Sequence, residues 1–410
     1  MPNAARVAAD APDASPAPPA LARTLRSTIP ALDGVRGVAI LAVLAHQLCI
    51  DGYTHGRGGG GAVVEWVLAP FQAGWAGVQI FFVLSGFLIT GILLDTRRAA
   101  NFWSSFYVRR ALRIFPLYYL VLLGTFVVAP RLFDLSTAVL AEHRHQTLYW
   151  LYLANVPVLT GNGAVDSLGH CWSLSIEEQF YLVWPFAVRF LDERGMVRLC
   201  LIAVFAAFLL RLGLRLAGAN PEIAYELMPA RADALAMGAL AAVVVRRREW
   251  VAWIAPRLGR FLVAVSVLLA AIALAGGMLA RNNAVTQTAG YTVVALVTAL
   301  VLLEATLETA NGHGRLARTL SAPLLRRYGK YSYAIYLFHH PLNLFVARRF
   351  FAPRLAALSP GQFLALQAAY FVVGGLALLL LGSLSYKLVE KPILDLRRFF
   401  LARGAESPSA

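Results

Sequence analysis

Charged side chains are scarce in this sequence of 410 residues, where Asp, Glu, Lys and Arg together make up 14%. A soluble domain contains about 25% charged residues. Hydrophobic residues make up 59% of the chain, and the mean hydropathy is +0.63. This composition excludes an ordinary soluble globular protein.

Alternating apolar and polar residues, the pattern of a membrane β-barrel, are also missing. The apolar residues instead form long runs, such as 261–280 and 363–385. Crossing a hydrocarbon core takes about 20 residues of helix, and in lipid each backbone amide must be hydrogen-bonded within its own segment. The sequence therefore predicts an all-α fold, a polytopic integral membrane protein.

Cysteine is rare as well. The three cysteines, Cys49, Cys171 and Cys200, are odd in number and lack the spacing of a metal site. They indicate no disulfide framework, and no metal is expected.

About ten transmembrane helices are predicted from the apolar runs. One further apolar segment, 148–159, is too short to cross the membrane and is predicted to be re-entrant or interfacial. The predicted spans are 34–50, 75–95, 114–130, 173–190, 197–217, 231–245, 261–280, 290–308, 331–350 and 363–386.

The net charge of +15 comes from arginines clustered between apolar runs, not spread over one polar face. This distribution argues against nucleic acid as a partner and follows the positive-inside rule. With both termini in the cytoplasm, the clusters at 97–98, 109–113 and 246–248 also lie there. The opposite loops contain few basic residues, namely Arg57, Arg131, Arg144, Arg281 and Arg354.

Three regions of the chain are expected. Residues 1–28 are rich in Ala and Pro and are predicted to be a disordered cytoplasmic tail. Residues 29–393 form the membrane domain. Residues 394–410 form a basic cytoplasmic tail.

Ionisable residues inside predicted spans are costly and indicate function. Asp33 and Arg36 lie three residues apart and can pair on one helix face, although they can equally mark the cytoplasmic boundary. His46 lies ten residues deeper among Leu and Ala. It is either a packed core residue or a base with a pKa near neutrality.

A second cluster comprises His170, Trp172, Glu177 and Glu178. Ser175 and Glu178 match the capping box S-x-x-E, which explains Glu178 without chemistry but leaves His170 and Trp172 unexplained.

Two further motifs carry polar residues. Ser85 precedes Gly86 in an apolar helix, a pair that favours close helix packing more than catalysis. His339 and His340 precede Pro341, which should kink the helix and free a carbonyl. Such a kink lines a cavity or only serves packing.

Together these blocks resemble the acyltransferase family 3 membrane proteins, which O-acylate sugars and other hydroxylated compounds. The resemblance covers residues 29–393. The matching blocks, in order, are ALDGVRGVAILAVLAH (31–46), GVQIFFVLSGFLITG (77–91), RRALRIFPLYYL (109–120), HCWSLSIEEQFYLVWP (170–185), RADALAMGAL (231–240), GKYSYAIYLFHHPL (329–342) and LVEKPI (388–393).

The resemblance implies a ten-helix fold and an acyl-CoA donor, usually acetyl-CoA. It also implies that Arg36 and His46 are catalytic, because the family's Arg…His pair falls on them. Nine residues separate the two here and ten in many relatives, so Arg36 is also a candidate for anchoring or for donor binding. His340 stands where relatives usually have tryptophan.

The expected mechanism has His46 as the base that deprotonates a hydroxyl, with Glu177 or Glu178 orienting its ring. Arg36 or Arg231 would stabilise the oxyanion or bind the donor. Arg109, Arg110 and Arg113 would bind the phosphates of coenzyme A, or serve only the positive-inside rule. The substrate cavity is expected to include Ser85, His170, Trp172 and His339.

The predicted function is transfer of an acyl group, most often acetyl, from acyl-CoA to a hydroxyl of a sugar, glycan or glycosylated small molecule. The expected location is the bacterial cytoplasmic membrane, with the lipid bilayer, the donor and a carbohydrate acceptor as partners. The alternative is a proton-coupled secondary transporter, which predicts repeat symmetry between the two halves; none is visible in the sequence.

Overall fold

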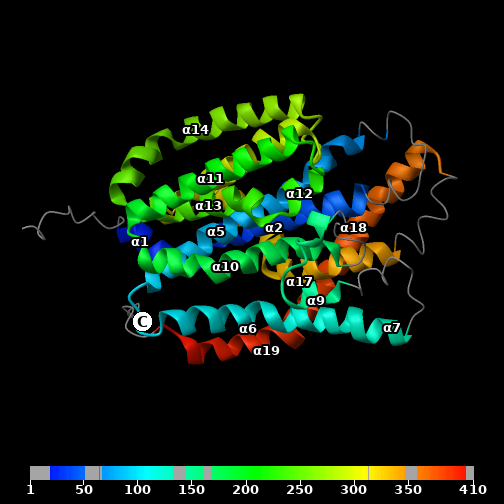
Figure 1. Ribbon diagram of the computed structural model, residues 1–410, viewed down its shortest axis with the longest axis horizontal. Helices are drawn as coiled ribbons and strands as arrows, with labels where there is room; N and C mark the ends of the chain where they lie inside the picture. Colours follow the sequence, from blue (N-terminus) through cyan, green and yellow to red (C-terminus); the bar gives the residue numbers. More distant parts are fainter. Residues whose placement is uncertain are drawn as a thin grey trace, which may run out of the picture.

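The computed structural model describes residues 19–50, 64, 67–132, 145–160, 168–312, 314–346 and 358–402. These residues form a bundle of long helices running roughly side by side, and they include no β-strand (Figure 1). The all-α prediction is confirmed.

Ten long helices make up the bundle, and each corresponds to one predicted span. In chain order they are α2 (Pro30–Leu44), α5 (Ala76–Thr96), α6 (Phe102–Leu123), α10 (Trp172–Phe190), α11 (Glu193–Leu216), α13 (Met228–Val244), α14 (Arg248–Ala275), α15 (Tyr291–Ala310), α17 (Pro323–Val346) and α18 (Pro360–Ser385).

Eight of these ten helices, with their flanking turns, are long and apolar enough to cross a membrane. The other two, α10 and α17, have 19 and 24 residues but contain more polar side chains. Both helices contribute to the cavities described below. Their lower hydropathy thus reflects polar groups that face the interior of the bundle instead of lipid.

Short elements complete the described chain. They are α1 (Pro19–Arg26), α7 (Ala129–Leu132), α9 (Gln146–Trp150), α12 (Pro221–Glu226), α16 (Arg315–Leu320) and α19 (Lys391–Leu394), with π-turns at Ala45–Ile50, Gly124–Val128, Thr286–Gly290 and Tyr386–Glu390 and 3-10 turns at Ala69–Trp75, Pro157–Thr160, Gly169–Cys171 and Asp395–Phe400.

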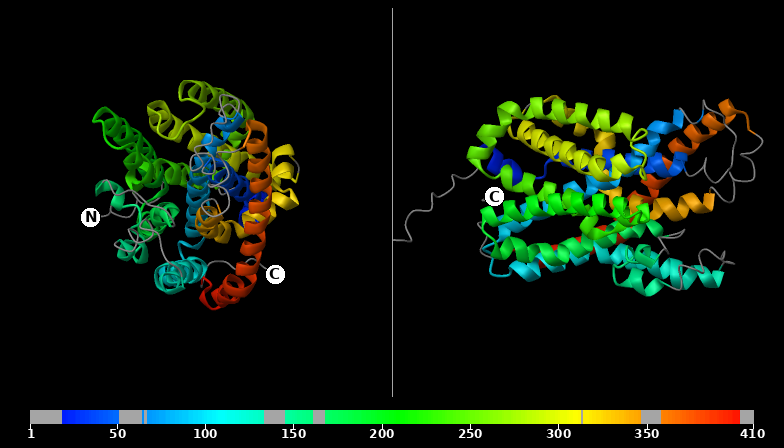
Figure 2. Two further views of the ribbon diagram at one scale, coloured as in Figure 1. Left: turned by 90° about the vertical axis from the view of Figure 1, so that its right-hand side faces the viewer. Right: turned by 45° about the horizontal axis from the view of Figure 1, so that its top comes forward.

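The bundle has two ends, which we name after the short helices α1 and α12 that lie there (Figure 1). Helices α2 and α5 lie near its middle when it is viewed end-on (Figure 2). Helices α11 and α14 lie at the periphery, with long apolar side chains such as Phe205 and Val263 exposed. In a membrane these exposed apolar side chains face lipid.

Close contact between α5 and α13 depends on two glycines. A Cβ atom at Gly86 would lie 2.0 Å from the Leu235 carbonyl oxygen, and one at Gly238 would lie 1.9 Å from that of Val83. Only glycine allows two backbones to approach so closely. The close-packing prediction for the Ser85-Gly86 pair is confirmed.

The segment 148–159 does not cross the bundle. It contains the end of α9, a turn and the start of the 3-10 turn Pro157–Thr160, and it packs against α10. The Ala154 amide donates to Ser175 Oγ over 3.1 Å, and Gln179 Nε2 donates to the Tyr152 carbonyl over 3.1 Å. The prediction of a short non-spanning segment is confirmed.

These contacts also correct the capping-box prediction. Helix α10 begins at Trp172, so Ser175 lies inside its first turn and cannot cap it. The Ser175 hydroxyl instead donates to the Cys171 carbonyl and accepts from the Ala154 amide. Glu178 is therefore not half of a capping box.

Other boundaries also differ from prediction; α14, for example, begins at Arg248 and not at 261. Residues 19–26, expected to be disordered, form α1, in which Leu21 is buried; residues 1–18 lie outside the described part. Helix α6 begins at Phe102, not 114, so Arg109, Arg110 and Arg113 lie within a helix. The helix tolerates these three charged residues because all three side chains line cavities.

Candidate active site

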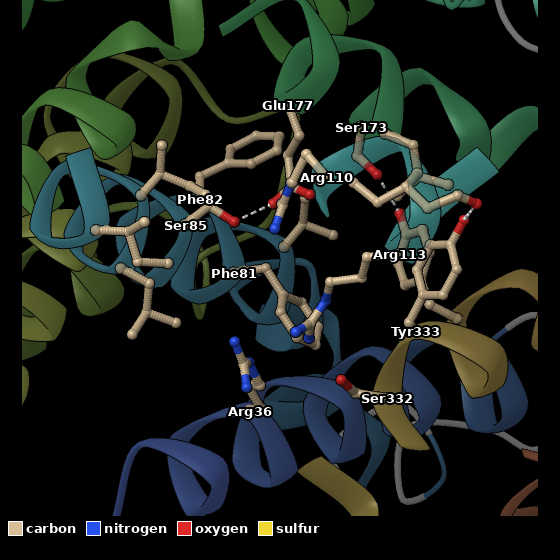
Figure 3. Close-up of a pocket in the computed structure, with 17 residues that line it drawn as sticks. Arg36, Phe81, Phe82, Ser85, Arg110, Arg113, Ser173, Glu177, Ser332 and Tyr333 are labelled. Carbon is tan, nitrogen blue, oxygen red and sulfur yellow. Dashed lines mark hydrogen bonds between the residues drawn. The ribbon is translucent and has the colours of Figure 1, made fainter. Parts of the chain in front are cut away.

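A cavity of about 210 Å³ opens between α2, α5, α6, α10 and α17. We call it the arginine cavity, because three of its polar side chains are arginines. Figure 3 shows the three guanidinium groups directed toward the same space. Its polar lining residues are Arg36, Ser85, Arg110, Arg113, Ser173, Glu177, Ser332, Tyr333 and Tyr336.

One carboxylate faces these arginines. Ser85 Oγ donates to Glu177 Oε1 over 2.5 Å (Figure 3). The Tyr181 hydroxyl donates to Ser85 Oγ over 2.9 Å. Arg110 lies over the Tyr181 ring, 3.8 Å from its centroid, and interacts electrostatically with Glu177 and Glu178. Ser85, which we expected mainly to serve packing, therefore also holds the carboxylate of the cavity.

Arg36 lies at the side of the cavity formed by α2. Its Nη1 donates to Asp33 Oδ1 over 3.1 Å, which confirms the predicted pair. Both side chains are about one-quarter exposed. Arg36 is in the arginine cavity with Arg110 and Arg113, whereas His46 is in another cavity.

A second cavity of about 140 Å³ lies toward the α12 end. We call it the histidine cavity, because four histidines line it: His46, His170, His339 and His340. Gln47, Trp172, Glu226, Arg281 and Tyr336 also line it. The ring centroids of His170 lie 4.9 Å from those of His339 and 5.3 Å from those of His340.

The tautomer of His46 follows from its hydrogen bond. Nδ1 lies 3.2 Å from the Phe71 carbonyl oxygen. Because a carbonyl only accepts, Nδ1 carries the proton and Nε2 is the basic nitrogen. This is the tautomer of a general base, and a backbone carbonyl supports it.

The predicted pairing of His46 with Glu177 or Glu178 is not found. Glu177 lines the arginine cavity, and Glu178 lines neither of the two cavities. The sequence suggested the pairing by analogy with a catalytic triad, in which an acid orients the ring of the histidine base. The structure instead places the carboxylate beside Arg110 and the imidazole beside a carbonyl.

Arg231 does not line either cavity. It is fully buried, and its guanidinium lies 4.3 Å from the Tyr291 ring centroid and 5.1 Å from that of Tyr225. None of its three guanidinium nitrogens has a hydrogen-bond partner among the described residues. These aromatic rings enclose the guanidinium group and interact with it by cation–π contacts in the core. Arg231 was predicted to stabilise the oxyanion or bind the donor, but the structure places it outside both cavities.

Two useful residues were missed in the sequence. Tyr336 lines both cavities, and its hydroxyl lies 2.6 Å from Ser173 Oγ and 3.1 Å from the His170 carbonyl oxygen. Its spacing of three residues from His339 was a signal, since both then lie on one helix face.

Arg281, counted only as a loop arginine, lines the histidine cavity and pairs with Glu222 over 2.6 Å. Burial acts to lower the pKa of Arg281, but Tyr225 and Glu222 outweigh burial and raise it above the ordinary value. The group is therefore cationic.

The fold and site define a class: a polytopic all-α membrane protein with two polar cavities inside its helical bundle. Residues 29–387 match the family model described as an acyltransferase domain. The chain therefore belongs to this acyltransferase family. The resemblance inferred from the sequence is confirmed.

Similar proteins carry more specific names. The chain is 29% identical over 339 residues to the peptidoglycan O-acetyltransferase OatA of Listeria monocytogenes, covering 78% of this chain and 51% of that protein. It is 25% identical over 343 residues to the O-acetyltransferase OatA of Staphylococcus aureus, covering 78% and 53%. It is 29% identical over 337 residues to the putative peptidoglycan O-acetyltransferase YrhL of Bacillus subtilis, covering 78% and 51%.

The chain thus spans about half the length of the curated relatives it matches. No solved structure matches it at a significant level.

Proposed function

We propose that this protein is a membrane O-acetyltransferase that moves an acetyl group from acetyl-CoA to a hydroxyl of a glycan. Family membership and the names of the relatives support this chemistry. The observation that carries the proposal is that a cationic cavity and a histidine cavity share two wall residues, Val78 and Tyr336.

The arginine cavity suits the donor. Coenzyme A is polyanionic, and guanidinium groups bind phosphate through charge-assisted hydrogen bonds. Apolar side chains such as Val78, Phe81 and Leu174 line the same cavity and suit the chain that carries the thioester. The donor would lie with its phosphates toward Arg110 and Arg113 and its thioester toward Tyr336.

The histidine cavity suits the acceptor hydroxyl. His46 Nε2 takes the hydroxyl proton, and the oxygen attacks the thioester carbonyl. The carbon–sulfur bond then breaks, the new ester leaves with the acceptor, and coenzyme A leaves as a thiolate that takes up a proton. The Tyr336 hydroxyl, present in both cavities, can donate to the developing oxyanion.

Direct transfer is the simpler route across the protein. Because the cavities share walls, the thioester needs to move only past Val78 and Tyr336 to meet the acceptor. We place the α1 end in the cytoplasm of a bacterium. The arginine clusters at 97–98 and 246–248 lie at this end, and basic clusters mark the cytoplasmic side of a membrane protein. Coenzyme A would then enter from the side on which it is made.

Thioester consumption tests this function. Purified protein in lipid nanodiscs should release free thiol from acetyl-CoA when a glycan acceptor is added. His46→Ala should lower this rate by at least a hundredfold, because general-base catalysis contributes about 10²- to 10⁴-fold. Thiol release unchanged by His46→Ala would remove this residue from the chemistry. Proton-coupled solute uptake without thioester consumption would favour a transporter.

A further inference from the structure

Residues 386–400, of which 394–400 were predicted to belong to a tail, pack along α6. The π-turn Tyr386–Glu390, α19 and the 3-10 turn Asp395–Phe400 follow α18 and contact α6 (Figures 1 and 2). The Asn101 side chain, just before α6, donates to the Leu401 carbonyl over 2.8 Å. The C-terminal segment is therefore part of the fold at the α1 end.

A third cavity, of about 160 Å³, lies between this segment and α6. We call it the C-terminal cavity. Four arginines line it: Arg109, Arg110 and Arg113 from α6, and Arg397 from the C-terminal segment. Ile89, Ile92, Phe106 and Leu394 supply its apolar lining.

The C-terminal cavity adjoins the arginine cavity. Ile89, Ile92, Arg110 and Arg113 line both. A ligand can thus contact Arg397 and Arg109 with one part and extend past Arg110 and Arg113 into the arginine cavity. The basic groups follow one another from the outside of the protein toward Glu177 and Ser85.

The charge of the C-terminal cavity is unbalanced. No carboxylate lines it. Asp395, in the same segment, pairs with Lys391 over 3.1 Å. The carboxylates that interact with Arg110 and Arg113, namely Glu177, Glu178 and Glu390, lie outside the cavity. Arg109 Nε donates to the Ser105 carbonyl over 2.8 Å, while its charge and that of Arg397 repel each other. Such a site is stabilised by an anion between the two guanidinium groups.

Another cavity beside the arginine cavity differs from the C-terminal cavity in its charge balance. It also adjoins the arginine cavity, through Arg36, Leu88 and Ile92, and it contains Arg36 and Arg246. Each of these two arginines already has a carboxylate: Asp33 at 3.1 Å and Asp95 at 2.8 Å. Two pairs leave that cavity close to neutral. Charge therefore favours the C-terminal cavity as the anion site.

We propose that the C-terminal cavity binds the nucleotide end of coenzyme A, with Arg397 and Arg109 holding its 3′-phosphate. This inference rests on the proposed use of an acyl-CoA donor. The 3′-phosphate is the anionic group farthest along the molecule from the thioester, and these two arginines line the C-terminal cavity but neither of the two inner cavities. The diphosphate then lies beside Arg110 and Arg113.

The test compares coenzyme A with 3′-dephospho-coenzyme A, measured as binding to the purified protein and as KM of the two acetyl thioesters. For the natural sequence we expect coenzyme A to bind about tenfold more tightly, the size of one charge-assisted contact. Arg397→Gln should weaken coenzyme A binding by nearly that factor and leave dephospho-coenzyme A unchanged. The preference for the 3′-phosphate should disappear.

Arg398→Gln is the matched control. Arg398 is the next residue, lies over the Phe399 ring at 4.9 Å and lines none of these cavities. It should keep the preference. An Arg397→Gln protein that keeps the preference, or that loses affinity for both ligands equally, overturns the assignment of Arg397 to the 3′-phosphate.

Failure of the proposed function gives a different result. A natural protein that binds neither ligand and consumes no thioester refutes the donor and this site together. A natural protein that binds coenzyme A with the 3′-phosphate preference, but transfers no acetyl group, supports the site while refuting the function.

Discussion

Ser85 and Glu177 join α5 to α10 through a hydrogen bond of 2.5 Å inside the arginine cavity. The bond fixes the one carboxylate among the described lining residues opposite Arg110. Glu177 is thus held by a neutral donor and faces a cation. These two interactions can be separated by mutation.

Glu177→Gln keeps an acceptor for Ser85 but removes the charge that faces Arg110. Ser85→Ala removes the hydrogen-bond donor but keeps that charge. Losing an interaction with a charged group costs about 1.5–3 kcal/mol, and losing a neutral hydrogen bond about 0.5–1.5 kcal/mol. We expect kcat/KM for acetyl-CoA to fall by about tenfold or more in Glu177→Gln and by less in Ser85→Ala.

Glu178→Gln serves as the control for that comparison, because Glu178 lines neither inner cavity. It should keep most of the activity. A loss as large as that of Glu177→Gln would mean that the two acids act together through Arg110.

The contact between α5 and α13 predicts a stability difference between two Gly→Ala variants. Gly238→Ala places a Cβ atom 1.9 Å from the Val83 carbonyl oxygen, so the helices must separate. Overpacking of this kind costs about 1–3 kcal/mol or more. Gly213→Ala in α11 meets nothing within 4 Å. Thermal unfolding in detergent should show a lower Tm for Gly238→Ala and an unchanged or higher Tm for Gly213→Ala. Equal Tm values would contradict the close approach.

Arg211 and Asp233 form a buried ion pair whose side chains are both 0% exposed, with Nη2 and Oδ2 2.8 Å apart. Thr292 Oγ1 accepts from Arg211 over 2.6 Å and donates to Asp233 over 2.8 Å. Removing one partner leaves a buried charge, which costs about 3–5 kcal/mol. We expect Asp233→Leu to be strongly destabilised.

The double variant Arg211→Met, Asp233→Leu should recover part of that loss, because it leaves no unpaired charge. Neither residue lines the three cavities assigned to the reaction, so the folded double variant should keep its KM for acetyl-CoA. Additive destabilisation in a double-mutant cycle would refute the coupling.

The orientation in the membrane is open to cysteine labelling. Ser104 lies at the α1 end and Ala284 at the opposite end, and both are exposed. Cys171 and Cys200 are buried, so only Cys49 needs to be replaced. An impermeant maleimide added to the outer face should label Ala284→Cys and spare Ser104→Cys. Labelling of Ser104→Cys alone would show that the protein has the opposite orientation, in which coenzyme A could not enter from the cytoplasm at the α1 end.

The sequence by itself determined the all-α membrane fold, the places of the ten long helices and the membership in the acyltransferase family. These follow from local properties: runs of apolar residues of the right length and short motifs in a recognisable order. Even the close packing at Gly86 was visible, because a small residue in an apolar helix has few other uses.

Only the tertiary structure decided which polar residues meet. His46 and Glu177 were expected together but line different cavities, while Arg36 joins Arg110 and Arg113 from a distant part of the chain. Arg231 was expected to stabilise the oxyanion or bind the donor but is enclosed by aromatic rings. Arg397 was assigned to a tail but lines a cavity. The physical reason is that helix length depends on local composition, whereas the direction of a side chain depends on the rotation and packing of each helix against its neighbours, and one residue of register turns a side chain by about 100°.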